Sequence, residues 1–219
     1  MTTILVGLTT TKKDQILSKI SEIKKFKITQ IAYFPTCLTR IERDNFAKEL
    51  ESIPNLEIPH IHLRSDMGDE EIEYYISKFK TKIFNIHPRN SKFGIFKIGD
   101  KYKKKVYVEN SGGIPTNNEL QEYGGVCIDF AHWETGKKYL PELYKNFQTL
   151  IQTHTIGCCH ISAIRDENEG HLDQHFLKNI QDMDYILKYI RYFPEFASLE
   201  LENSISEQLE IKKYIEQSL

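Results

Sequence analysis

The sequence predicts a compact α/β protein, one domain over residues 1–219, in which eight parallel strands close a (β/α)8 barrel. Three observations lead to this prediction. Eight short apolar segments alternate with about seven segments of helical periodicity, which is typical of parallel β/α units. Six of the apolar segments end in His, Asp or Glu, and all strands of a parallel barrel open their carboxyl ends on one face. The 219 residues contain no linker or low-complexity tract, and eight such units need roughly 200–400 residues.

The first half of the chain predicts four strands and three helices. The strands are short apolar runs at 4–8, 28–34, 56–62 and 82–87. After the first strand, apolar residues recur at helical spacing from Ile16 to Phe26, which predicts a helix over 13–26. A charged helix is predicted over 40–50. A third helix is predicted over 69–79, where acidic residues in the first turn suit the helix dipole.

The connection between the fourth and fifth strands departs from this rhythm. Residues 90–105 contain Ser91, Gly94, Gly99 and several lysines, without a helical stripe. We therefore predict a loop or a short irregular helix there. The lysine run at 101–105 immediately precedes a strand, which places it on the amino-terminal face of the barrel as a solvated charged segment.

The second half of the chain predicts the four remaining strands. They lie at 105–109, 126–129, 155–161 and 196–202. A short helix is predicted over 118–123, and a long one over 137–153, where apolar residues share one face. A polar loop over 165–170 leads to a helix that ends at Ile190, and a last amphipathic helix is predicted over 205–218.

The composition argues against several classes of protein. A net charge of -2 gives no global attraction to nucleic acid or to an anionic membrane. No apolar run approaches the ~20 residues of a membrane span, and the N-terminus lacks the regions of a signal peptide. The four cysteines form no Cys-x-x-Cys pair, and three lie in predicted strands, as small buried residues of a reducing compartment do. We therefore expect a cytoplasmic protein without a membrane partner.

The ends of the strands carry the candidate functional residues. In the segment Gly125–His132, an apolar strand ends in Asp129, and His132 follows three residues later. A carboxylate at the end of a buried strand needs a partner, and carboxylate with imidazole is a reasonable pair of metal ligands. A single histidine at a strand end is more often a packed residue than a ligand. The pattern recurs, however, at the ends of five other strands, in His60 and His62, His87, Glu109, His160, and Glu200 and Glu202.

These motifs and their order resemble the endonuclease IV branch, AP endonuclease family 2, of the xylose isomerase-like TIM barrels. That superfamily also holds sugar isomerases and epimerases. The resemblance covers the chain from the third strand to the eighth. It rests on Ile58-Pro59-His60, His87-Pro88, Val108-Glu109-Asn110, Asp129-x-x-His132, His160, Asp173-x-His175 and Leu201-Glu202-Asn203.

The resemblance implies up to three divalent metal ions, with zinc as the usual metal of endonuclease IV. The three sets of ligands would be His60 and His87 with a shared Glu109; Glu109, Asp129, His160 and Glu202; and His132, Asp173 and His175. Two alternatives stay open. His62 lies on the same strand face as His60 and could replace or join it, and Glu200 could replace Glu202.

Two enzyme classes follow from this resemblance. A metal-dependent phosphodiester hydrolase would act on damaged DNA or on a small phosphorylated substrate, with Glu109 bridging metals ~3.5–4 Å apart. A sugar or sugar-phosphate isomerase or epimerase would use one Mn, Mg or Co ion, with Glu109 and Glu202 transferring a proton. The number of ligands favours hydrolysis, whereas the short, slightly acidic chain favours a small substrate. A barrel that only binds its ligand is the third hypothesis.

Two further residues are candidates for contact with the substrate. Arg165 follows the seventh strand and could bind a phosphate or carboxylate, although a solvated arginine fits the pattern equally well. Trp133 is adjacent to the proposed ligand His132, and we predict that it lines the pocket.

Overall fold

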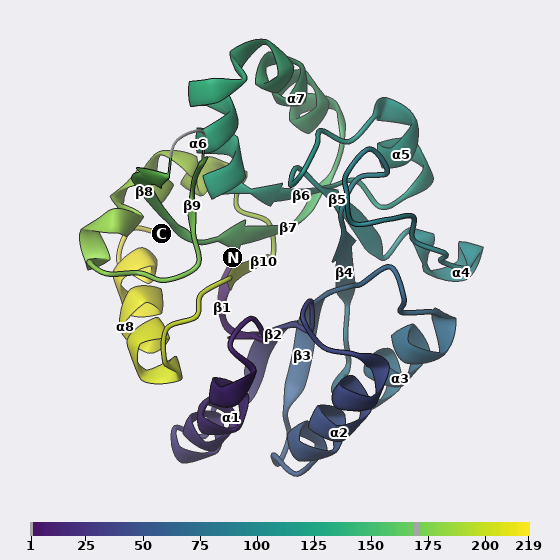
Figure 1. Ribbon diagram of the computed structural model, residues 1–219, viewed down its shortest axis with the longest axis vertical. Helices are drawn as coiled ribbons and strands as arrows, with labels where there is room; N and C mark the ends of the chain where they lie inside the picture. The colour runs from purple at the N-terminus through teal and green to yellow at the C-terminus, as the bar shows by residue number, and fades with distance from the viewer. Residues whose placement is uncertain (1, 169–170) are drawn as a thin grey trace.

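The computed structural model describes residues 2–168 and 171–219. Eight parallel strands close into a barrel, with helices around it (Figure 1). Each strand pairs with the next in the chain, and the last lies between the seventh and the first. The strands are β1 (Thr3–Thr9), β2 (Gln30–Phe34), β3 (Glu57–His62), β4 (Ile83–Ile86), β5 (Val106–Glu109), β6 (Val126–Asp129), β7 (Ile156–Ile161) and β10 (Phe196–Leu199). The predicted (β/α)8 TIM barrel is confirmed.

Most of the outer helices lie where the periodicity predicts them. They are α1 (Ile16–Lys25) after a 3-10 turn η1 (Lys13–Gln15), α2 (Arg40–Glu51), α3 (Asp69–Phe79), α4 (Asp100–Lys103), α5 (Asn117–Glu122), α6 (Phe130–Tyr139), α7 (Pro141–Thr153), the 3-10 helix η2 (Ile180–Tyr192) and α8 (Ile205–Glu216). Thr39, Thr116 and Ser204 begin α2, α5 and α8 with capping boxes. Over the residues described, none of the helices combines the length and apolar character that crossing a membrane requires.

The single helix predicted over 137–153 is wrong, because two helices fill this region. The side chain of Asp129 accepts a hydrogen bond from the backbone N–H of His132 and so starts α6 directly after β6. The backbone then leaves helical geometry at Leu140, and Pro141 begins α7. As a result Leu140 and Leu143 stay 56% and 43% exposed and do not join the core.

The connections after β4 and β7 are irregular in different ways. Between β4 and β5 the only helix described is the four-residue α4, as predicted. After β7, the predicted loop over 165–170 instead begins with strand β8 (Ala163–Asn168), which pairs with β9 (His171–Gln174) in an antiparallel hairpin. Residues 169 and 170 lie outside the described part of the chain. The next helix is the 3-10 helix η2, which ends at Tyr192, close to the predicted end at Ile190.

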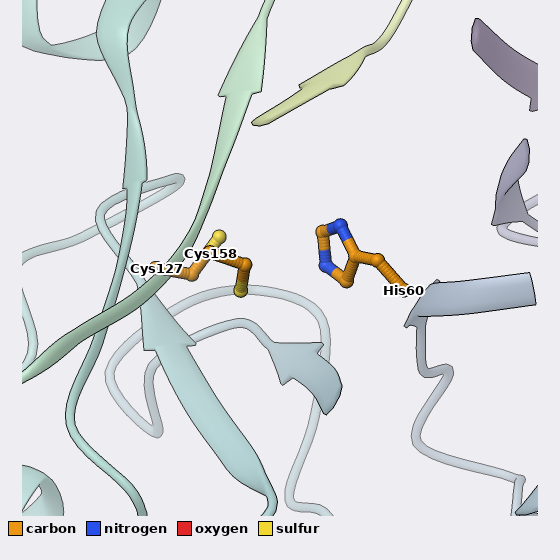
Figure 2. A group of neighbouring side chains, drawn as sticks. All are labelled: His60, Cys127 and Cys158. Atoms are coloured by element: carbon orange, nitrogen blue, oxygen red, sulfur yellow. The ribbon is translucent and has the colours of Figure 1, made fainter. Parts of the chain in front are cut away.

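Inside the barrel, strands contribute residues in two successive layers. Residues i and i+2 of a strand share a face, so the later residue of each pair lies closer to the carboxyl ends. The pairs are His60 and His62 on β3, Cys127 and Asp129 on β6, and Cys158 and His160 on β7. We call the first members the lower layer (His60, Cys127 and Cys158), and their side chains point toward one another (Figure 2). The second members form part of the upper layer.

The barrel closes where β1 meets β10, and one side chain of α8 supports that closure. Gln208 accepts a hydrogen bond from the Gly7 N–H at 2.7 Å and donates to the Gly7 carbonyl at 3.0 Å. It also donates to the carbonyls of Leu201 and Asn203, at 3.2 and 3.0 Å. The ladder between β1 and β10 covers only Thr3 to Leu5 of β1. Gln208 therefore satisfies backbone groups just beyond the point where the paired strands separate.

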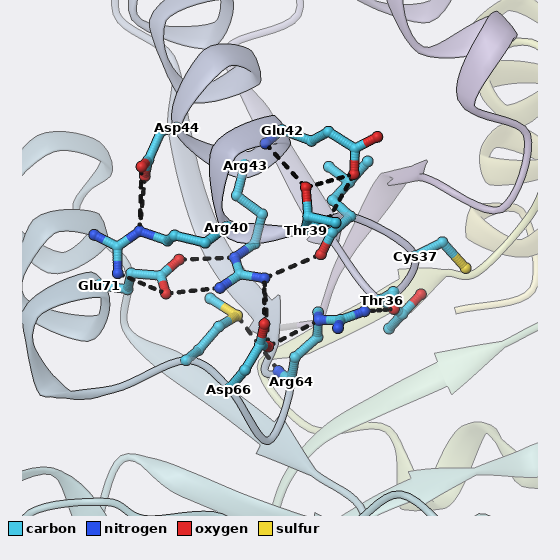
Figure 3. Close-up of polar contacts among 12 residues, drawn as sticks. Thr36, Cys37, Thr39, Arg40, Glu42, Arg43, Asp44, Arg64, Asp66 and Glu71 are labelled. Atoms are coloured by element: carbon cyan, nitrogen blue, oxygen red, sulfur yellow. Dashed lines mark hydrogen bonds and ion pairs between the residues drawn. The ribbon is translucent and has the colours of Figure 1, made fainter.

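On the outside of the barrel, a buried arginine joins α2 to α3. Arg43 is 1% exposed and binds Glu71 with two parallel hydrogen bonds, from Nε and Nη2, at 2.8 and 2.9 Å (Figure 3). Its Nη1 also lies 3.1 Å from Asp66 and donates to the Leu38 carbonyl at 3.0 Å. This network fixes the loop after β3, because Asp66 also binds Arg64 at 2.9 Å.

Replacing Arg43 with methionine is expected to destabilise the protein by about 3–5 kcal/mol, because Glu71 is left as a buried carboxylate without its main partner. The matched control is Arg40→Met. Arg40 contacts the same carboxylate at 3.2 Å but is 51% exposed, so its loss should cost less than about 1 kcal/mol. Urea unfolding followed by circular dichroism measures both. Equal losses in the two variants would contradict the importance of the buried pair.

Candidate metal centre

A cavity of about 870 Å³ lies at the carboxyl ends of the strands. It is lined by imidazoles and carboxylates from several different strands and loops. They are His62, His87, Glu109, His132, His171, Asp173, His175 and Glu200. His160 and Asp129 lie directly beneath, at 0% and 1% exposure. The convergence predicted from the strand ends therefore occurs in the folded chain.

Glu109 is the centre of this arrangement. One oxygen, Oε2, lies 3.1 Å from His62 Nε2 and 3.6 Å from His160 Nδ1. The same oxygen accepts a hydrogen bond of 2.7 Å from the side-chain amide of Asn85. Burial opposes the charged form of Glu109, but His160 and His62 outweigh it and hold its pKa well below the ordinary value. Glu109 is therefore an ionised carboxylate between two imidazoles, the position a bridging metal ligand needs.

His160 is fully buried among three carboxylates. Its Nδ1 lies 3.1 Å from Glu200, 3.6 Å from Glu109 and 3.9 Å from Asp129. Burial lowers the pKa of His160, but Glu109 and Glu200 outweigh that effect and raise it well above the usual value. Within the described residues, neither ring nitrogen makes a hydrogen bond. Buried polar atoms without partners are costly, and a cation held between them would satisfy them.

Asp129 has two separate roles. Its Oδ1 accepts the hydrogen bond from the His132 N–H at 2.7 Å that caps α6. Its Oδ2 is buried and finds no hydrogen-bond donor among the residues described. Burial, against the attraction of His132, raises the pKa of Asp129 to about 7. The oxygen of Asp129 that is not used by the helix therefore faces the site.

A second cluster lies next to the first. The β8–β9 hairpin supplies Asp173, whose Oδ2 is 3.7 Å from His132 Nε2 and 3.3 Å from His175 Nε2. His132 Nε2 also lies 3.0 Å from the Ser111 hydroxyl. Burial lowers the pKa of His175, but Asp173 outweighs it and raises the value to about 9. The potential ligand atoms of His132, His171 and Asp173 lie within 4.8 Å of one another, so His171 is an additional neighbour of this set.

His87 completes the first cluster from the β4 side. Its ring centroid lies 4.6 Å from that of His62 and is stacked at 3.8 Å on Phe93. The potential ligand atoms of His62, His87 and Glu109 lie within 4.8 Å of one another. Burial and then the proximity of His62 lower the pKa of His87 to about 4. His87 is therefore neutral at neutral pH, the form in which an imidazole binds a metal.

Of the two histidines on β3, the structure places His62 in the cavity and His60 one layer below. His60 uses both ring nitrogens, with Nδ1 2.7 Å from Ser198 Oγ and Nε2 3.0 Å from Asn85 Oδ1. His62 therefore lines the cavity at the mouth of the barrel, and His60 is not among the described residues that do. The physical reason is depth, because two residues on one face of a strand differ by one layer along the barrel.

The same reasoning explains why Glu200, and not Glu202, lines the cavity after β10. Ser198 contacts His60 in the lower layer, so Glu200, two residues later, reaches the upper layer beside His160. Glu202 instead forms an ion pair of 3.0 Å with Lys12. It is not among the described residues that line the cavity. A catalytic role for Glu202 therefore finds no support in its position.

The two predicted substrate contacts also lie elsewhere. Trp133 is 1% exposed and packs against Phe147 and Tyr189, with ring centroids at 5.6 and 5.0 Å. It belongs to the core outside the barrel, because it lies one helical position away from His132 on α6. Arg165 donates to the Phe176 carbonyl at 2.7 Å and lies 3.9 Å from Asp182. It connects the hairpin to η2 and is not among the described residues that line the cavity.

Two basic side chains that the sequence analysis did not select do line the cavity, Arg64 and Lys92. Arg64 Nη1 donates to the Thr36 carbonyl at 2.5 Å, and its Nε donates to Asp66 at 2.9 Å. Both residues belong to the loops after β3 and β4. Functional loops of parallel barrels lie at the carboxyl side of the strands. The position of Arg64 and Lys92 in such loops was the sequence signal that could have identified them as cavity residues.

Replacing Glu200 with glutamine is expected to weaken zinc binding roughly 10- to 100-fold, because His160 loses the carboxylate nearest to it. Glu202→Gln is the matched control two residues away and should change the affinity less than about twofold. Competition with a chromophoric chelator measures both affinities. A larger loss in Glu202→Gln would restore the ligand set that the family resemblance implies and contradict the geometry.

Comparisons with known proteins concern the fold. No protein-family model matches the chain, and no curated protein sequence matches it. Solved structures do match over their whole length. AsbF of Bacillus anthracis, assigned as a 3-DHS dehydratase of petrobactin synthesis, has a TM-score of 0.52 at 16% identity and covers 99% of this chain and 98% of its own. SacUVDE has a TM-score of 0.53 at 12% identity, with 99% of each chain covered.

A protein from Rhodospirillum rubrum, assigned as a xylose isomerase, has a TM-score of 0.51 at 12% identity, with 100% of this chain and 97% of its own covered. Identities this low show a common fold and no more. The chain shares the closed eight-stranded TIM-barrel fold of these structures, so the resemblance drawn from the strand-end motifs is confirmed at the level of the fold.

Proposed function

We propose that this chain is a metal-dependent enzyme that hydrolyses phosphodiesters with two or three divalent cations, zinc first among them. One observation carries the proposal. The ionised carboxylate of Glu109 lies between His62 and His160, and the ligand atoms of Glu109, Asp129 and His132 come within 4.8 Å of one another. The two clusters are therefore continuous, as a site for adjacent cations requires.

The donor atoms of the site fit zinc. They are imidazole nitrogens and carboxylate oxygens, which zinc accepts readily, and the unpartnered atoms of His160 and Asp129 would be satisfied by a cation. The three sets of residues would be His62, His87 and Glu109; Glu109, Asp129, His160 and Glu200; and His132, Asp173 and His175. Bound cations in such a site supply an acidified water and stabilise the attacking and leaving oxygens of a phosphoester.

The residues around the ligands hold them in orientation. Asn85 donates to Glu109, and its own carbonyl oxygen is bound to His60 Nε2, so the Glu109 carboxylate is fixed from below. Ser111 contacts His132 at 3.0 Å. Arg64 and Lys92 bring positive charge to the cavity wall, where they would bind the non-reacting oxygens of a phosphate. Hydrogen bonds from neighbouring residues to the ligands orient those ligands in metal sites.

The cavity favours a small phosphodiester over duplex DNA as substrate. Its volume of about 870 Å³ suits a small molecule. Phe93, Leu140 and Leu143 line it and give one side an apolar wall. The chain as a whole carries a net charge of -2, which gives no attraction to a polyanion. Damaged DNA is therefore the second substrate to test.

One observation favours the alternative, a sugar or sugar-phosphate isomerase or epimerase. Glu109 and Glu200 lie 3.6 and 3.1 Å from the same nitrogen of His160. Two carboxylates near one position could remove and return a proton, with a single Mn, Mg or Co ion. Glu200 would then take the role that the sequence analysis gave to Glu202.

The number of cations per chain separates the two functions. Elemental analysis of protein purified without a metal-binding tag is expected to give two or three zinc ions. Hydrolysis of bis(p-nitrophenyl) phosphate and of an abasic-site duplex should then be detected and should disappear with chelator. One manganese, magnesium or cobalt ion, with turnover of ketoses or phosphosugars and no phosphodiester hydrolysis, would favour the isomerase instead.

Zinc affinity is expected to rise as the pH rises above 6.5. Protonated His160, whose pKa is raised above 6.5, must release its proton to bind a cation, so each released proton changes the apparent affinity about tenfold per pH unit. In the metal-free protein, the stability contributed by His160 depends on pH in the opposite direction to the zinc affinity. The stability from protonated His160 is complete below its unfolded pKa and is lost as pH rises through the raised folded value.

Calorimetric titration with zinc in two buffers of different ionisation enthalpy counts the released protons. Asp129, with a pKa of about 7, should add to the slope below that pH, because its ionised form binds the cation. A zinc affinity that does not change over this range would show that His160 is not a ligand.

A further inference from the structure

The lower layer of the barrel contains an unusual set of side chains. His60, Cys127 and Cys158 come from three strands, β3, β6 and β7, and each is 0% exposed. Their potential ligand atoms all lie within 4.8 Å of one another. Cys127 and Cys158 face each other in register on adjacent strands, and both side chains point toward the ring of His60 (Figure 2). Interior layers of such barrels are usually filled by branched aliphatic residues.

The other two cysteines of the chain show that this arrangement is specific to the lower layer. Cys159 lies on the opposite face of β7 and packs in the main hydrophobic core between the barrel and its helices. Cys37 is exposed at the edge of the upper cavity. The two cysteines of the lower layer are placed with an imidazole, their ligand atoms within 4.8 Å of one another.

We propose that His60, Cys127 and Cys158 form a second metal site, one for a thiophilic cation such as zinc, cadmium or copper(I). Two sulfurs and one imidazole nitrogen make a soft donor set. The upper layer offers oxygen and nitrogen, and the Cys127 sulfur also lies within 4.8 Å of the ligand atoms of Glu109 and His160. The two sites, one layer apart on the same strands, would therefore select different classes of ion. This inference does not depend on the hydrolytic function proposed for the upper site.

Binding has a defined stoichiometry of protons and hydrogen bonds. A divalent ion takes up two thiolates, so the two thiols release two protons and the charges balance. One nitrogen of His60 must also give up its present partner, either the Ser198 hydroxyl at 2.7 Å or the Asn85 carbonyl at 3.0 Å. Because Asn85 also donates to Glu109, the lower site is connected to the bridging carboxylate above.

Access determines how the site is loaded. The three side chains have no exposed surface, and the ligands of the upper layer lie between them and the cavity. An ion therefore reaches the lower layer during folding rather than by diffusion into the folded barrel. The experiment accordingly uses the full chain refolded from denaturant, under reducing conditions, with cadmium added as the probe.

Refolding with cadmium is expected to give an ultraviolet thiolate-to-cadmium charge-transfer band. The double variant Cys127→Ser/Cys158→Ser should lack that band. The matched controls Cys159→Ser and Cys37→Ser should keep it, and so should His62→Gln, which alters only the upper layer. The absence of a band in the wild-type protein, its persistence in the double variant, or its loss in Cys37→Ser would overturn the proposal.

A second measurement needs no variant and so does not depend on the double variant folding. The wild-type chain is alkylated with iodoacetamide in mild denaturant, with and without cadmium, and the modified peptides are quantified by mass. We expect cadmium to slow modification of Cys127 and Cys158 at least about tenfold, with Cys37 unchanged. Equal rates would contradict the site. Protection that disappears with reductant, without any metal, would show a Cys127–Cys158 disulfide and equally overturn it.

Discussion

Replacing Glu109 with glutamine is expected to remove most of the bound metal from the upper site and to lower the rate of phosphodiester hydrolysis on the order of a thousandfold. The Oε2 atom of Glu109 is close to both His62 and His160, so one substitution affects two adjacent cation positions. Glutamine keeps the size of the side chain but loses its charge, which two neighbouring cations need. Metal content by elemental analysis and turnover of bis(p-nitrophenyl) phosphate measure the two effects.

The control for this experiment is Glu210→Gln, an exposed glutamate of α8 on the surface. It removes the same charge from the chain and should leave metal content and turnover unchanged. A Glu109→Gln protein that keeps two or three zinc ions would show that the bridging arrangement is wrong. Retained metal with lost activity would instead assign Glu109 to proton transfer, as the isomerase requires.

Replacing Gly7 with alanine is expected to prevent folding or to destabilise the protein by more than about 4 kcal/mol. A Cβ atom at Gly7 would lie 1.8 Å from the backbone carbonyl oxygen of Leu199 in β10. The backbone of a closed barrel cannot move enough to remove that overlap, and both backbone hydrogen bonds of Gly7 to Gln208 would be disturbed. Urea unfolding, or the yield of soluble protein where folding fails, measures the effect.

Gly68→Ala is the matched control for this prediction. Gly68 precedes α3, and a Cβ atom there would meet no other atom within 4 Å. Its stability should change by no more than about 0.5 kcal/mol. If Gly7→Ala and Gly68→Ala unfold at the same urea concentration, the barrel is not closed as tightly at β1 and β10 as the structure has it.

The alternation of strands and helices could be predicted from the sequence because it depends on local periodicity. The bounds of α3 and β6 follow directly from it. The prediction of a single helix over 137–153 is wrong because helix boundaries depend on local capping as well as on periodicity. Its apolar stripe is real, but Pro141 begins a new helix, and the capping oxygen of Asp129 starts α6 directly after β6.

The choice between His60 and His62, and between Glu200 and Glu202, could not be made from the sequence. Both members of each pair share a strand face. The sequence does not show how deep each side chain lies along the barrel axis. Depth depends on how neighbouring strands are staggered around the barrel, which is a property of the closed ring. The contact between Ser198 and His60 fixes that stagger across the barrel, and it joins residues 138 positions apart.

The prediction for Trp133 is wrong for another reason, because neighbours in the sequence need not share a face. The place of Trp133 next to His132 in the sequence predicts a position in the pocket, but adjacent residues on a helix point about 100° apart. His132 faces Asp173, whereas Trp133 faces Phe147 of α7. Arg165 was taken for a loop residue, and its surroundings depend on a hairpin whose pairing no local pattern indicated.

The contacts of Gln208 at the junction of β1 and β10 have a consequence for the order of events in folding. Gly7 and Gln208 are 201 residues apart, so this contact joins β1 to α8 across most of the sequence and comes late. Until β10 pairs with both β1 and β7, the barrel has open strand edges, and such edges can pair with other chains. The period before closure is therefore when the chain is most exposed to aggregation.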